Sequence, residues 1–71
     1  MKVEISVIRK TTYTSLVEME PATFYRIKNG LDSSSRDERR AAEKDANRRI
    51  DTKDWQDDDL DSVEEFKPYA P

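Results

Sequence analysis

Cysteine and histidine are both missing from this chain of 71 residues, and glycine occurs only once. Without cysteine there is no disulfide and no thiolate ligand, and without histidine the other common zinc ligand is missing too. The same absences remove cysteine–histidine and serine–histidine nucleophile pairs and histidine general bases. We therefore expect a protein that is not an enzyme and that needs no metal or cofactor.

Long apolar runs are also missing. Glu4 stands between Val3 and Ile5, so the first residues predict neither a secretory signal nor a membrane span, and we expect a cytoplasmic protein. Apolar residues make up 34% of the chain and charged residues 41%. A chain of this length buries only about 60% of the surface that its unfolded form exposes. We expect one small domain, whose modest core a second copy would supplement.

The first twenty residues predict an antiparallel hairpin with strands at about 2–9 and 12–19. Apolar and polar residues alternate in the first stretch, and the second is rich in β-branched and aromatic residues. The connection between them lacks glycine, asparagine and aspartate, so the turn type is not determined. A register shifted by one residue, which would exchange the buried and exposed faces, is the alternative. The residues expected on the buried face are Val3, Ile5, Val7, Tyr13, Val17 and Met19.

A first helix is predicted over about 21–29, with Pro21 in its first turn and Asn29-Gly30 as its C-cap. A strand over 23–28 that enters an Asn-Gly hairpin is the alternative, but the serines that follow supply no returning strand. The helical interpretation gives a stripe at spacings of three and four, made by Phe24, Ile27 and Leu31.

A second helix is predicted over about 35–49, because Ser35 and Glu38 match a capping box. Its apolar stripe is narrow and consists of Ala42, Ala46 and Ile50. The overall prediction is an α+β fold in which the hairpin packs on two helices.

Charge divides this chain into two parts. Residues 1–50 contain eleven Lys/Arg and eight Asp/Glu, which gives a net charge of +3. Residues 51–71 contain two Lys/Arg and eight Asp/Glu, which gives −6, and the two parts add up to the total of −3. Within this acidic C-terminal segment, Leu60, Val63 and Phe66 recur every three residues. This spacing favours a short helix or irregular structure over a strand.

Concentrated negative charge around a single tryptophan is typical of a surface that repels nucleic acid and attracts basic protein grooves. On a helix, neighbouring carboxylates lie about 5–6 Å apart, a spacing of the same order as successive phosphates. A solvated, solubilising tail and a core role for Trp55 are the alternatives. The residues predicted to bind a partner are Asp54, Trp55, Asp57, Asp58, Asp59, Asp61, Glu64 and Glu65.

Two other site types fit the sequence less well. Alternating aspartates at 57, 59 and 61 begin like a calcium loop, but Ser62 stands where glycine is required and Pro68 where the bidentate glutamate belongs. The arginine-rich helix has four acids interleaved with its cations, so direct nucleic-acid binding is not expected. The four acids are Asp37, Glu38, Glu43 and Asp45.

In size, composition and layout the chain resembles the small acidic accessory proteins of bacteriophages and mobile elements. The features that carry the resemblance are the hairpin, the short helix that begins at Pro21, and the stretch Asp51-Thr52-Lys53-Asp54-Trp55-Gln56-Asp57-Asp58-Asp59-Leu60-Asp61-Ser62-Val63-Glu64-Glu65-Phe66. The resemblance implies a stoichiometric inhibitor of the anti-CRISPR or DNA-mimic type. Its expected partner is a host protein with a basic groove, such as a CRISPR effector, in the host cytoplasm. The alternatives are a homodimer formed through the edge of the hairpin and a weak nucleic-acid-binding regulator that uses the arginine-rich helix.

Overall fold

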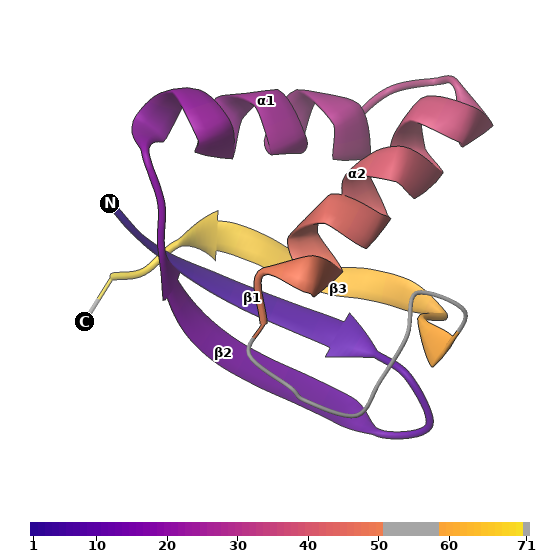
Figure 1. Cartoon of the computed structure of the whole chain (residues 1–71), viewed down its shortest axis with the longest axis horizontal. Coiled ribbons are helices and arrows are strands. Elements are labelled where there is room, and N and C mark those ends of the chain that lie inside the picture. The colour runs from indigo at the N-terminus through magenta and orange to yellow at the C-terminus, as the bar shows by residue number, and fades with distance from the viewer. Residues whose placement is uncertain (51–58, 71) are drawn as a thin grey trace.

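The computed structural model describes residues 1–50 and 59–70 and shows an α+β fold, as predicted. Its strands form one antiparallel sheet in the order β2-β1-β3, and both helices lie over the same face of that sheet (Figure 1). The elements in chain order are β1 (Lys2–Ile8), β2 (Thr12–Glu18), α1 (Pro21–Leu31), α2 (Arg36–Arg48) and β3 (Ser62–Pro68).

The hairpin of β1 and β2 has the predicted buried face. Val3 lies opposite Val17, and Val7 opposite Tyr13. All three apolar residues of β1 that face the helices, namely Val3, Ile5 and Val7, are 0% exposed. Tyr13 is 43% exposed, although it lies on the same face. The main contacts of the helical layer with the sheet are with β1 and β3, so the helices leave this end of β2 largely uncovered.

Helix α1 begins at Pro21, as predicted, but does not end at Asn29-Gly30. It continues through Leu31, and Gly30 lies inside it without a positive φ, so the predicted C-cap is wrong. Gly30 instead allows the two helices to approach closely. A Cβ added at Gly30 would lie 2.7 Å from the Cβ of Ala42 on α2.

Helix α2 begins with the predicted cap. The Oγ of Ser35 accepts a hydrogen bond from the amide of Glu38 at 3.3 Å. The return bond of the capping box is replaced by a relay through Ser33, whose Oγ accepts from the amide of Ser35 at 3.1 Å and donates to the Glu38 carboxylate. The predicted stripe is confirmed, since Ala42, Ala46 and Ile50 are all buried.

The short helix or irregular structure predicted for the acidic segment is wrong where the structure describes it, because residues 62–68 form a strand that pairs with β1. Val63 lies opposite Val7 and Glu65 opposite Ser6, so Glu64 is the extra residue of a β-bulge. A bulge shifts the alternation by one, and residues three apart then face the same side. The bulge accounts for the spacing of three between Val63 and Phe66, whereas Leu60 lies before the strand.

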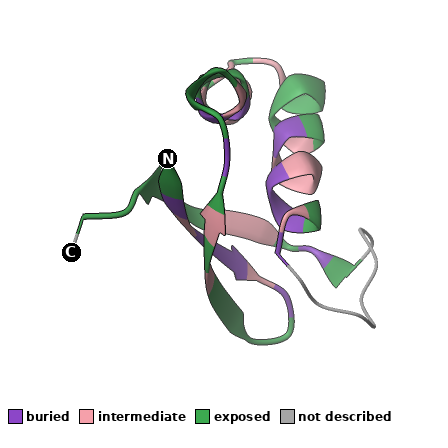
Figure 2. Cartoon of the chain, turned by 60° about the vertical axis from the view of Figure 1, so that its left-hand side comes forward, coloured by how far each residue is buried: buried purple, intermediate pink, exposed green. Residues whose placement is uncertain are grey.

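The core lies between the sheet and the helices, and the ring of Phe66 on β3 stacks on that of Phe24 on α1 with centroids 5.1 Å apart. The opposite face of the sheet carries no helix among the described residues (Figure 2). On that face the hydroxyls of Ser6 and Thr14 form a hydrogen bond of 2.8 Å. Within the described ranges no helix has the length and hydropathy to cross a membrane.

Candidate partner-binding edge

Four of the eight predicted partner-binding residues follow one edge of the sheet. We call these residues the acidic edge: Asp59, Asp61, Glu64 and Glu65. All four are exposed, and they lie on β3 or directly before it. The other four, Asp54, Trp55, Asp57 and Asp58, lie outside the described residues. The described acids therefore do not have the helical spacing that was expected, because Glu64 and Glu65 lie on a strand and Asp59 and Asp61 precede it.

The first part of the acidic edge is anchored through its backbone. Leu60 is 2% exposed and belongs to the core. The guanidinium of Arg40, on α2, donates hydrogen bonds to the carbonyl oxygens of Leu60 at 2.7 Å and Asp61 at 3.3 Å. The amide of Asp61 donates to the carbonyl of Ile8 at 2.9 Å. The carboxylates on either side of Leu60 are therefore exposed on a fixed backbone.

The second part of the acidic edge lies at the bulge. Glu65 forms an ion pair of 3.6 Å with Lys67, which also pairs with Glu4 at 3.6 Å. Exposed ion pairs of this kind contribute about 0–1 kcal/mol, so they neutralise the surface without fixing it strongly. Asp61 and Glu64 form no ion pair with any of the described residues. Their charges are available to a partner.

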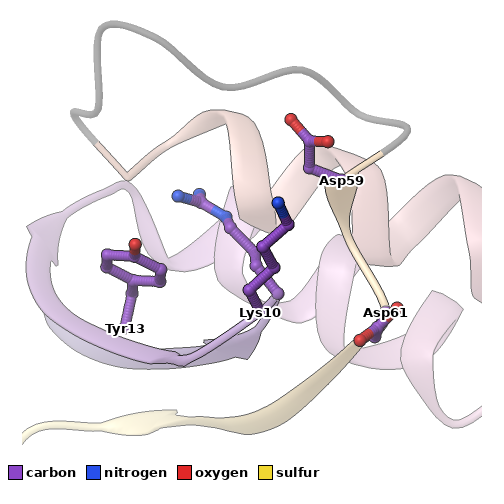
Figure 3. A pocket seen from close by; sticks show the side chains of 5 residues that line it. Lys10, Tyr13, Asp59 and Asp61 are labelled. Carbon is purple, nitrogen blue, oxygen red and sulfur yellow. The ribbon is translucent and has the colours of Figure 1, made fainter.

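A pocket of about 650 Å³ opens between the acidic edge and the hairpin turn, and Figure 3 shows the side chains that line it. Asp59 and Asp61 contribute two carboxylates to it, and Arg9 and Lys10 contribute two cations. Charges of both signs therefore line the pocket, so the pocket itself is not a purely anionic site.

Arg9 is buried beneath this pocket, at 6% exposure. Its Nη2 donates a hydrogen bond of 2.7 Å to Oδ1 of Asn47, and its guanidinium carbon lies 4.9 Å from the centroid of the Tyr13 ring, a cation–π geometry. Burial lowers the pKa of Arg9, while Tyr13 and Asp59 act in the opposite direction. Sequence reasoning missed this cluster, because a buried arginine leaves no periodic signature.

The arginine-rich helix uses several of its cations inside the molecule. Arg40 holds the backbone before β3, Arg39 donates to the carbonyl of Ser33 at 3.0 Å, and Arg49 pairs with Asp45 at 3.2 Å. Fewer cations are therefore available to bind a polyanion than the number of arginines in the sequence suggests. That the helix does not bind nucleic acid directly stays a prediction, and this arrangement agrees with it.

No group of three or more acidic side chains among residues 1–50 and 59–70 is placed to hold a metal ion. A scan against protein-family models found no match, and searches of curated proteins and of solved structures found no similar chain. The candidate site therefore rests on its own geometry.

Proposed function

We propose that this protein is a non-enzymatic inhibitor or modulator that binds a basic, nucleic-acid-binding surface of a host protein through the acidic edge. The observation that carries the proposal is the set of exposed carboxylates on β3 and directly before it, where the backbone is fixed by Arg40 and by pairing with β1. A backbone that is already fixed loses little conformational entropy on binding, so more of the interaction energy of its carboxylates appears as affinity.

Electrostatics supports a basic protein surface as the partner. The segment from residue 51 onward carries −6 and repels the phosphate backbone, whereas a groove that binds nucleic acid offers clustered lysines and arginines. Attraction of this kind is screened over about 8 Å at physiological ionic strength, so binding should weaken as salt rises. The resemblance to small phage-encoded accessory proteins supports a host complex, such as a CRISPR effector, as the class of target.

Two triple variants test the acidic edge, and each changes the net charge by three. The edge variant retains Asp59, because that carboxylate interacts with Arg9, and it carries Asp61→Asn, Glu64→Gln and Glu65→Gln. The control variant neutralises three exposed acids away from β3 and carries Glu20→Gln, Asp32→Asn and Asp37→Asn. Circular dichroism establishes that both variants fold.

The tagged protein and both variants are used to capture partners from a bacterial lysate at low and high salt. We expect a nucleic-acid-binding protein that a DNA oligonucleotide displaces, that the edge variant fails to capture, and that the control variant retains. Equal loss with both variants would show that only net charge matters, and full retention with the edge variant would show that the working surface lies elsewhere. Either result overturns the proposal.

A further inference from the structure

Among residues 1–50 and 59–70 no strand pairs with the outer edge of β2, which presents a row of backbone groups. Met1 and Met19 exchange backbone hydrogen bonds of 2.7 and 2.9 Å, and the amide of Arg9 donates to Thr11 at 3.0 Å. Because hydrogen-bonded pairs alternate along an antiparallel ladder, the odd-numbered residues of β2 bond to β1. The even-numbered residues, which are Thr12, Thr14, Leu16 and Glu18, direct their amides and carbonyls away from the sheet.

Nothing in β2 protects this edge against pairing. The strand contains no proline, no lysine and no bulge, and it is rich in β-branched residues. The opposite edge, on β3, has the bulge at Glu64, the charge of Lys67, and Pro68. Pro68 lies opposite Val3, whose backbone groups face β2, so the missing amide of Pro68 is on the outward side. One edge is closed to a further strand, and the other is open.

We propose that β2 pairs antiparallel with β2 of a second copy of this chain, giving a two-fold symmetric dimer with a continuous six-stranded sheet. Outward groups face each other only when even-numbered residues are paired with even-numbered residues. Among such registers one overlaps all seven residues of the strand, and a shift of two residues reduces the overlap to five. In the register that overlaps all seven residues, the two-fold axis of the dimer passes between the two copies of Ser15.

The sequence of β2 is complementary to itself in this register. Glu18 lies opposite Thr12 of the second copy and Leu16 opposite Thr14, so no two like charges are opposed. On the helix-covered face Tyr13 lies opposite Val17. Pairing covers Tyr13 and Leu16, which are 43% and 46% exposed in the single chain. This fit to its own sequence is why we assign the edge to a second copy and not to an unrelated strand.

The dimer does not depend on the proposed function. Because β2 and β3 are opposite edges of the sheet, both acidic edges remain exposed at the outer ends of the six-stranded sheet. A dimer would then offer two acidic edges to a partner with repeated sites. Failure of the dimer leaves the binding proposal for the single chain unchanged, and failure of the binding proposal leaves the dimer unchanged.

Single-cysteine variants test the register, because the chain has no cysteine of its own. Paired copies of residue 15 would have Cα atoms about 4.5 Å apart, which is within disulfide reach. Copies of residue 12 would be six positions apart along the strand, or about 20 Å. Under mild oxidation we expect Ser15→Cys to form a covalent dimer of twice 8.3 kDa and Thr12→Cys to remain monomeric. Equal cross-linking of both variants, or preferential cross-linking of Thr14→Cys, overturns this register.

Sedimentation of the unmodified chain tests the dimer itself. Pairing of one strand buries less than the roughly 1,200 Å² of a standard interface, so we expect a weak dimer whose average mass rises with concentration. Leu16→Pro removes an outward amide that β1 does not use, and it should weaken the dimer at least about tenfold while the hairpin still forms. If this variant does not fold, Leu16→Lys replaces it with the same expectation. A monomeric mass for the unmodified chain at every concentration overturns the proposal.

Discussion

The two edges of the sheet differ in both packing and backbone. On β3, Phe66 is buried against Phe24, Arg40 holds the backbone that leads into the strand, and Pro68 and the bulge prevent further pairing. On β2, the side chains are mostly exposed and the outward backbone groups are unprotected. β3 thus completes the fold and presents charge, whereas β2 pairs with β1 alone among the described strands, so its outer edge is available for another strand.

Truncation of one apolar residue on each edge should change stability by very different amounts. Phe66→Ala should lower the free energy of unfolding by about 3–5 kcal/mol, because it removes the ring stacked on Phe24 and leaves a cavity. Leu16→Ala should cost no more than about 0.5 kcal/mol at a site exposed to solvent. Urea unfolding of both variants measures the difference. Similar costs would mean that the two edges are equally packed.

A smaller effect is expected when the anchor of the acidic edge is removed. Arg40→Met abolishes the hydrogen bonds to the carbonyls of Leu60 and Asp61 and should cost about 1.5–3 kcal/mol, since hydrogen bonds from charged donors are among the stronger ones. Arg36→Met, at an exposed position of the same helix, is the control and should change stability by about 0.5 kcal/mol or less. Thermal unfolding compares them. An unchanged melting temperature for Arg40→Met would show that the anchor contributes nothing.

The smallest of the three effects concerns the helices that cover β1 and β3. Gly30→Ala gains about 1 kcal/mol of helix propensity, but overpacking against Ala42 costs about 1–3 kcal/mol, so we expect a net loss of about 1 kcal/mol. Asn29→Ala, at the exposed neighbouring position, should instead gain a few tenths of a kcal/mol. Denaturant midpoints separate the two variants. If Gly30→Ala stabilises the protein, the helices approach each other less closely than described.

Local patterns predicted most of the fold. The strands of the hairpin and both helices lie within two residues of the predicted bounds, because alternation, the proline at the first helical turn and the serine cap are all signals carried by neighbouring residues. β3 was missed, since its bulge is created by pairing with β1, where Val7 lies opposite Val63 and Ser6 opposite Glu65, far apart in the sequence. Gly30 was misassigned for a similar reason, because its role depends on Ala42 of another helix.

The candidate site was predicted less completely. Exposure of the acids from Asp59 to Glu65 follows from their charge, and the sequence alone indicated it. The contacts that hold those acids in place could not be predicted from the sequence. Arg40 bonds to Leu60, twenty positions away, and Arg9 bonds to Asn47, 38 positions away. Such contacts depend on the tertiary arrangement, which no local periodicity encodes.

Amide hydrogen exchange, measured residue by residue at two protein concentrations, tests the difference between the edges most directly. The outward amides of Thr14 and Leu16 on β2 should gain protection as the concentration rises, whereas the outward amide of Phe66 on β3 should not change. Protection that rises at Phe66, or at neither edge, would contradict the account.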